Sequence, residues 1–182
     1  MIFLTPHLGC FEMIGQYLSM RMPFCALYRP PRHKWLRELV EQSRTRPGFS
    51  TAPTDLSGVR TLLRALKRGE AIGLLPDQAP RAGEGRWIKF FGKPAYTMTL
   101  AGRLTESGAG VVLIWAERLP GGAGYHLHLS APAQAIDGTT EARAEQISQE
   151  IERMILQCPE QYLWGYNRYK RRRGTGAPVE SD

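Results

Sequence analysis

The most informative stretch of this chain is residues 2–12, whose sequence is IFLTPHLGCFE. The apolar run at its start predicts a short buried strand, and the segment from Gly9 to Met20 can form a helix. His7 would then lie at the carboxyl end of the strand, and Glu12 would lie in the first helical turn. Open α/β sheets bind ligands at such junctions, so this segment predicts a strand and a site together.

His7 and Glu12 together predict a general base and its orienting group. An unperturbed imidazole accepts a proton at a pKa of about 6.5, close to neutral pH. A neighbouring carboxylate can fix the tautomer of the ring and stabilise the imidazolium that forms. Residues five apart on one helix point about 140° apart, so the pair can meet only if His7 precedes the helix. Such pairs also occur by chance, so the rest of the chain has to support this interpretation.

Composition indicates one globular domain with a real core, because the chain has 182 residues of which 42% are hydrophobic and 23% charged. The net charge of +7 favours anionic partners, such as phosphates, acidic lipid surfaces, acidic proteins or nucleic acid. Three widely spaced cysteines without a CxxC pair indicate a reducing intracellular compartment. No apolar run reaches the roughly 18 residues of a membrane span, and no signal peptide is evident. Because the chain begins almost inside a strand, we expect upstream residues to be missing.

Strands and helices alternate along the chain, which predicts an α/β fold with a mixed, mostly parallel sheet flanked by helices. Strands are expected at residues 2–5, 24–28, 71–75, 110–117 and 125–130. Helices are expected at residues 9–20, 32–44, 56–68, 97–107 and 140–157. Residues 79–94 are expected to be irregular. One domain is predicted over residues 1–173, followed by a disordered tail at 174–182.

Further candidate site residues lie at the ends of predicted strands and helices. Asp77 directly follows the third strand and would share a sheet rim with His7, although aspartates are also common in turns. Arg29 follows the second strand, and arginine forks suit phosphate and carboxylate oxygens. Arg44 ends a predicted helix, where it could equally neutralise the helix dipole.

Three other patterns leave alternatives open. Residues 87–92, WIKFFG, would form an aromatic and cationic patch for a membrane if exposed, or a clamp over the core if packed. The basic tail at 168–173 would attract an anionic membrane, whereas no zinc finger, RNP motif or DNA-reading helix accompanies it to support nucleic-acid binding. His126 and His128 share a strand face and could form a metal pair, but a solvent face is preferred because no third ligand is evident.

No GxSxG elbow, P-loop or GxGxxG motif occurs, which removes the usual serine hydrolase, nucleotide and dinucleotide interpretations. An ordered set of other motifs runs from residue 1 to about residue 173: His7-x4-Glu12, Tyr28-Arg29-Pro30, Arg44-Thr45-Arg46, Pro76-Asp77-Gln78, Phe90-Phe91-Gly92, residues 159–164 (PEQYLW) and Arg168-Tyr169-Lys170.

This set resembles the bacterial lipid A biosynthesis acyltransferases, the Kdo-dependent lauroyl and myristoyl transferases of the lysophospholipid acyltransferase superfamily. The resemblance implies a glycerol-3-phosphate-acyltransferase-like fold and acyl transfer from an acyl-carrier-protein thioester to a hydroxyl of a lipid A precursor. It implies that His7 is the general base and Glu12 its partner. It also implies that Arg44, Asp77 and, less directly, Arg29 contribute to activity or substrate binding.

The resemblance also implies the surroundings of the reaction. A thioester is already activated, so no metal or organic cofactor is required. The expected partners are an acyl carrier protein, an anionic glycolipid or phospholipid acceptor and the inner-membrane surface, with no nucleic acid. Family members carry an N-terminal membrane helix before the His motif, which this chain lacks. We therefore expect this chain to be peripheral at the cytoplasmic face of the bacterial inner membrane, and its full-length form to be anchored.

Two alternatives remain open on the sequence. The same chemistry could act on another lysophospholipid or glycolipid acceptor. The chain could also be a non-catalytic lipid-binding module. A His7→Ala substitution separates this alternative from an enzyme, in which turnover should collapse while membrane binding survives.

Overall fold

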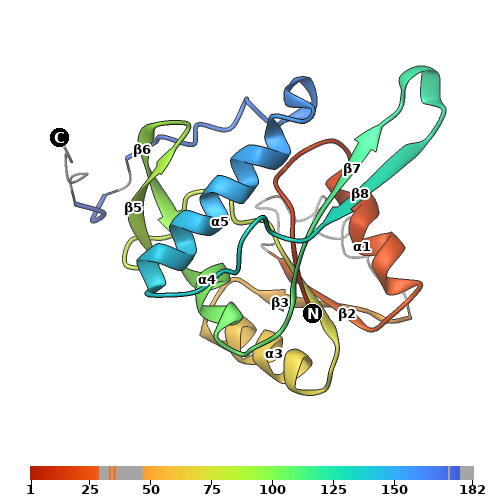
Figure 1. The fold of residues 1–182 in the computed structure, drawn as a ribbon. Helices are drawn as coiled ribbons and strands as arrows, with labels where there is room; N and C mark the ends of the chain where they lie inside the picture. Colours follow the sequence, from red (N-terminus) through yellow and green to blue (C-terminus); the bar gives the residue numbers. More distant parts are fainter. Residues whose placement is uncertain (29–32, 34, 36–46, 172, 177–182) are drawn as a thin grey trace.

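The computed structural model describes residues 1–28, 33, 35, 47–171 and 173–176. Among these residues, six strands form one sheet in the order β3-β2-β4-β1-β7-β8 (Figure 1). Five of them run parallel: β1 (Ile2–Leu4), β2 (Phe24–Tyr28), β3 (Phe49–Pro53), β4 (Ala71–Leu74) and β7 (Val111–Arg118). The edge strand β8 (Tyr125–Ser130) pairs antiparallel with β7. The predicted mixed, mostly parallel α/β sheet is thus confirmed.

Helices cover both faces of this sheet. Side chains alternate along β1, so that Ile2 and Leu4 enter a different core cluster from Phe3. Phe3 packs with residues of α1 (Phe11–Ser19), whereas Ile2 and Leu4 share a core with α3 (Leu56–Lys67), α4 (Leu100–Thr105) and α5 (Thr140–Ile155). Burial on both sides explains why the central strands are continuously apolar.

A second, two-stranded sheet occupies residues that we expected to be irregular. β5 (Gly85–Phe90) and β6 (Lys93–Met98) pair antiparallel beside α5 (Figure 1). They are joined at Phe91 and Gly92, which both have positive φ, at 46° and 74°. The prediction of an irregular stretch at 79–94 is therefore wrong, and the WIKFFG segment is packed, with Ile88 and Phe90 buried. The signal was weak because a Phe-Gly turn and polar strand positions conceal the hairpin.

One strand was not predicted, and one predicted helix boundary needs correction. β3 was not predicted, since only Ala52 of its five residues is buried and it ends in a proline at the sheet edge. The helix predicted from Thr97 begins at Leu100 instead, because Thr97 still belongs to β6. The helix predicted at 32–44 falls almost entirely outside the described residues, and so do residues 177–182 of the predicted tail.

The described segment after α5 turns back over the β5–β6 sheet. The Trp87 indole N–H donates to the Thr175 carbonyl at 2.8 Å, and the Tyr169 hydroxyl donates to the Phe90 carbonyl at 2.8 Å. Within the described ranges, no helix combines the length and apolar character needed to cross a bilayer.

Candidate active site

His7 and Asp77 meet because the strands that precede them are neighbours. β1 and β4 pair in parallel with Leu4 opposite Leu74, so the residues that follow both strands leave the same edge of the sheet. The imidazole Nδ1 lies 2.7 Å from Asp77 Oδ1, and the backbone N–H of His7 donates to Asp77 Oδ2 at 2.9 Å. The structure therefore brings together two residues predicted separately from strands about 70 positions apart.

The contacts of the His7 ring favour a single tautomer. A carboxylate can only accept, so Nδ1 carries the proton that is shared with Asp77. The other nitrogen, Nε2, then keeps its lone pair and accepts from the Gln78 side-chain amide at 3.2 Å. The ring is further positioned by Phe11, which packs edge-on at 4.9 Å between ring centroids. This arrangement leaves Nε2 as the basic atom of the site.

Asp77 is buried, with a side chain that is only 1% exposed. The Tyr162 hydroxyl hydrogen-bonds to it, and burial together with this carboxylate raises the pKa of Tyr162 far above its usual range. Tyr162 therefore stays protonated and donates. The guanidinium of Arg168 supplies a positive charge nearby, although its burial lowers the pKa of Arg168. Neither Tyr162 nor Arg168 was predicted as a site residue, although both lie in the motifs PEQYLW and Arg168-Tyr169-Lys170.

Arg168 is consequently part of the core rather than of a free basic tail. Its guanidinium donates to the Tyr96 carbonyl at 2.9 Å and to Thr97 Oγ1 at 2.6 Å. The expectation that this residue faces a membrane is wrong, because only 4% of Arg168 is exposed.

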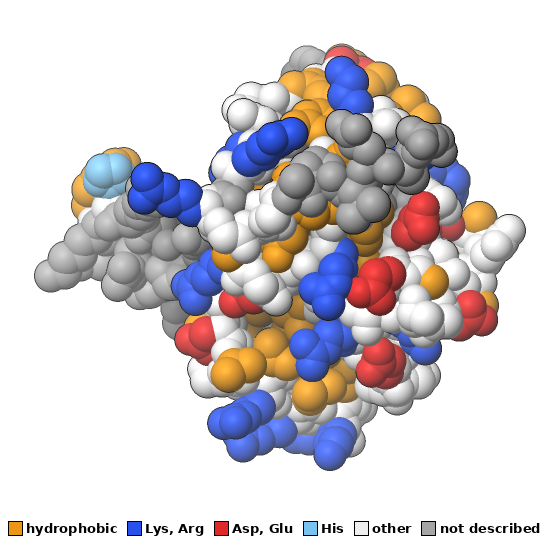
Figure 2. All heavy atoms as spheres, turned by 90° about the vertical axis from the view of Figure 1, so that its left-hand side faces the viewer, with side chains coloured by type: hydrophobic (Ala, Val, Ile, Leu, Met, Phe, Trp, Pro, Cys, Tyr) orange, Lys and Arg blue, Asp and Glu red, His pale blue; other side chains and the backbone are white. Residues whose placement is uncertain are grey.

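On the side of the molecule that carries β5 and β6, the coloured Lys and Arg side chains are interspersed with Asp and Glu (Figure 2).

Glu12 lies in the first turn of α1 with an exposed side chain, on the wall of the same cavity as His7. Glu12 was predicted as the orienting partner of His7, and the carboxylate that lies against Nδ1 is that of Asp77, which follows the strand next to β1. A role for Glu12 in catalysis stays a prediction.

Gly9 fixes the path of the chain between His7 and α1. Its φ is +58°, and a Cβ atom there would lie 2.0 Å from the Ala116 carbonyl oxygen. The next residue, Cys10, donates its N–H to that same oxygen at 2.8 Å, and Gly9 donates to the Gln161 carbonyl at 3.1 Å. The loop is therefore held between β7 and the turn η2 (Pro159–Gln161), and only glycine fits this close approach.

His7 opens onto a cavity of about 820 Å³, which reaches from the residues that follow β1 and β4 to Phe24 and Phe49 at the starts of β2 and β3. Its walls are largely apolar, with Phe11, Phe49, Leu56, Val59, Met98 and Leu100 among them. Two arginines not singled out from the sequence, Arg81 and Arg103, also line it. The predicted site residues Arg29 and Arg44 lie outside the described residues. The cavity can accept a long apolar group with a polar end near the imidazole.

The sequence of this chain is similar to those of one known protein family. A family model described as bacterial lipid A biosynthesis acyltransferase matches residues 1–171. The lipid A biosynthesis palmitoleoyltransferase of Escherichia coli (strain K12) is 29% identical over 170 residues, which cover 91% of this chain and 54% of that protein. The lauroyltransferase of the same organism is also 29% identical, with 91% and 55% covered. The chain spans about half the length of the curated relatives it matches.

Proposed function

The chain belongs to the bacterial lipid A biosynthesis acyltransferase family, and from that premise we propose that it moves a fatty acyl chain from an acyl-carrier-protein thioester to a hydroxyl of a lipid A precursor. The observation that carries this proposal is the 2.7 Å contact between His7 and buried Asp77 at the cavity. With the proton on Nδ1, the lone pair of Nε2 faces the Gln78 side-chain amide, and an alcohol would take the place of that amide to give Nε2 its proton.

In the proposed reaction, Nε2 of His7 takes the proton of the acceptor hydroxyl while its oxygen attacks the thioester carbonyl. Asp77 stabilises the imidazolium that results, and Glu12 on the cavity wall adds a second negative charge. The tetrahedral intermediate then collapses, the carbon–sulfur bond breaks, and the thiol leaves with the proton from His7. A base positioned in this way contributes a factor of about 10² to 10⁴ in rate.

The remaining residues of the site would hold the two substrates. The apolar walls of the cavity suit the acyl chain, and its volume of about 820 Å³ is large enough for one. Arg81 and Arg103, together with the predicted Arg29 and Arg44, would bind acidic groups of the acceptor. The net charge of +7 would attract an acidic carrier protein and the cytoplasmic face of the inner membrane, where we place this chain as a peripheral protein.

The test is a transfer assay with purified protein, a radiolabelled acyl-carrier-protein thioester and a lipid A precursor. We expect a His7→Ala variant to lose transfer, while His126→Ala, a histidine substitution on the β7–β8 hairpin, keeps it. Transfer that survives in His7→Ala would overturn the assigned mechanism. Binding of acceptor vesicles without turnover in the unsubstituted protein would favour a lipid-binding module.

The acceptor is tested separately by offering lysophospholipid and glycolipid acceptors in the same assay. We expect the lipid A precursor to react fastest. A faster reaction with another acceptor would leave the role of His7 intact and replace the proposed substrate.

A further inference from the structure

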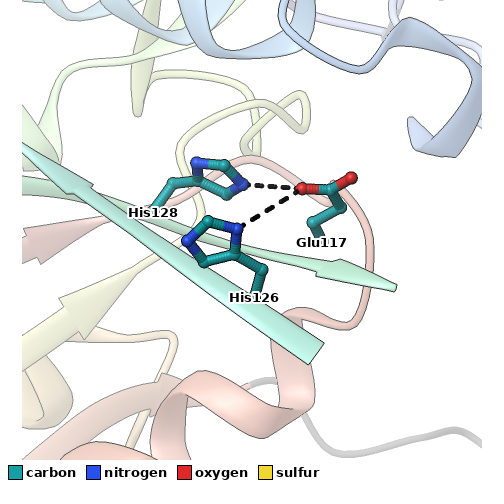
Figure 3. A group of neighbouring side chains, drawn as sticks. All are labelled: Glu117, His126 and His128. Atoms are coloured by element: carbon teal, nitrogen blue, oxygen red, sulfur yellow. Dashed lines mark hydrogen bonds and ion pairs between the residues drawn. The ribbon is translucent and has the colours of Figure 1, made fainter. Parts of the chain in front are cut away.

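The β7–β8 hairpin gathers three metal-ligating side chains on one face. Glu117 of β7 lies directly opposite His126 of β8, and His128 lies two residues further along the same face. One ligand atom from each residue lies within 4.8 Å of the others. Figure 3 shows both imidazole rings turned toward the Glu117 carboxylate. The third ligand that the two histidines lack in the sequence is therefore supplied by the neighbouring strand.

From this geometry we propose that Glu117, His126 and His128 bind a Zn²⁺ ion. Two imidazoles and one carboxylate are a common zinc donor set, which leaves a fourth position for water. Cations that prefer all-oxygen ligands, such as Mg²⁺ and Ca²⁺, are disfavoured by two ring nitrogens. The proposal is independent of the proposed function, because none of the three residues lines the cavity at His7.

The measured distances are close to those that zinc requires. Tetrahedral bonds of about 2.0–2.1 Å place neighbouring ligand atoms about 3.3 Å apart. Glu117 Oε2 lies 2.8 Å from His128 Nε2 and 4.0 Å from His126 Nδ1, on either side of that value. Side-chain rotations alone would open the first contact and close the second around an ion, without moving the paired strands.

Two features prepare the cluster for an ion from solvent. The Trp115 ring stacks on the His128 ring at 4.1 Å with an interplanar angle of 5°, which fixes the direction of one ligand. The side chains of His126, His128 and Glu117 are 62%, 32% and 31% exposed, so an ion and its waters can reach them. An ion there would tie the edge strand β8 to β7 near the part of the hairpin that projects from the sheet (Figure 1).

Binding is tested by isothermal titration of the whole, tag-free chain with Zn²⁺ in a reducing buffer that does not chelate metals. We expect one equivalent of Zn²⁺ with a dissociation constant in the micromolar range or tighter. Glu117→Gln, which keeps the shape but loses the charge, should weaken this binding at least about tenfold, because a charged ligand is lost. The double variant His126→Ala/His128→Ala should abolish it.

The matched control is His33→Ala, since His33 belongs to neither histidine site. It should bind Zn²⁺ as tightly as the unsubstituted chain, and circular dichroism should show that every variant is folded. Zn²⁺ should also raise the melting temperature of the unsubstituted chain but not that of the double variant. Unchanged affinity in the double variant, or the lack of a saturable first equivalent in the unsubstituted chain, would overturn the proposal.

Discussion

His7 and His128 each hold a ring nitrogen close to a carboxylate oxygen, at 2.7 Å from Asp77 and 2.8 Å from Glu117. The surroundings of the two pairs differ. The Asp77 side chain is 1% exposed, whereas that of Glu117 is 31% exposed. The first pair joins strands about 70 residues apart in sequence, and the second spans one hairpin. The two distances are nearly equal, but the His7–Asp77 pair is preorganised by its surroundings, whereas the His128–Glu117 pair can adapt.

The difference in burial determines what each pair can do. Asp77 is surrounded by the His7 amide, Tyr162 and Arg168, so its position is set by several elements at once. Such a carboxylate can orient an imidazole for proton transfer without reorganising. Glu117 is open to water and can move, which suits the capture of an ion better than the orientation of a base.

The largest difference between the two pairs should appear in activity. Asp77→Asn should lower kcat by about 10²- to 10⁴-fold, because the neutral amide no longer stabilises the imidazolium or fixes the tautomer. The matched substitution Glu117→Gln should leave kcat within about twofold of the unsubstituted value, since a pair outside the site supplies no general-base factor. Steady-state acyl transfer measures both, and similar losses in the two variants would refute the division of roles.

The next largest effect should be on stability. Arg168→Gln removes a buried cation next to Asp77 and leaves acceptors unpaired, so it should cost about 2–4 kcal/mol of unfolding free energy. For a chain of this length that corresponds to a melting temperature lower by roughly 5–15 °C.

The control for this experiment is Arg86→Gln. Arg86 pairs with Glu141 at 2.7 Å, but both side chains are more than half exposed. An exposed ion pair contributes little, so the melting temperature should hardly change. Calorimetry that finds equal shifts for both arginines would show that burial does not distinguish them.

A smaller effect is expected from the loop that follows His7. Gly9→Ala introduces a Cβ atom at a φ of +58° against the Ala116 carbonyl, and should cost at least about 2 kcal/mol. Gly121→Ala in the turn of the β7–β8 hairpin has a similar φ of +62° but nothing within 4 Å. Gly121→Ala should therefore lower the free energy of unfolding by only about 1 kcal/mol. Urea unfolding compares them, and equal costs would mean that the loop moves aside.

The smallest effect concerns thiol chemistry. Burial, aided by a hydrogen bond to Glu160, raises the pKa of Cys158 to about 11. At pH 8 only about one Cys158 thiol in a thousand is then ionised, because each pH unit below the pKa costs tenfold. Iodoacetamide should therefore label the more exposed Cys10 first, and Cys158 labelling should rise about tenfold per pH unit between pH 7 and 9. Mass spectrometry of labelled peptides measures this, and pH-independent labelling would contradict it.

Much of the fold was predictable, because the central strands carry continuous apolar runs and the helices carry start and stop signals. Asp55 illustrates this, since its side chain accepts from the backbone N–H groups of Ser57 and Gly58 at the start of α3, as a helix-capping aspartate is expected to do. The β5–β6 hairpin was missed because it is stabilised by α5 and the segment after it, and those contacts leave no local pattern.

The site was predictable only to the level of which residues lie at strand ends. Spacing along the chain favoured Glu12 as the partner of His7, whereas strand order decides which carboxylate lies beside it. The pairing of β1 with β4 is a long-range property, so Asp77 could be placed on the same rim but not bonded to Nδ1. The same limit applied to Glu117, which only the register of β7 against β8 brings to the two histidines.

The reach of Tyr162 and Arg168 back to Asp77 has a consequence for biosynthesis. His7 and Asp77 leave the ribosome well before Tyr162 and Arg168. During synthesis, Asp77 therefore first lacks the hydrogen bond from the Tyr162 hydroxyl and the positive charge of Arg168. The strands of the main sheet all precede α5, so the sheet can form first. The contacts around Asp77 are complete only when the segment after α5 has packed against it. A chain that ends after α5 contains all six strands of the main sheet but lacks Tyr162 and Arg168, so we expect it to form that sheet and to transfer acyl chains poorly.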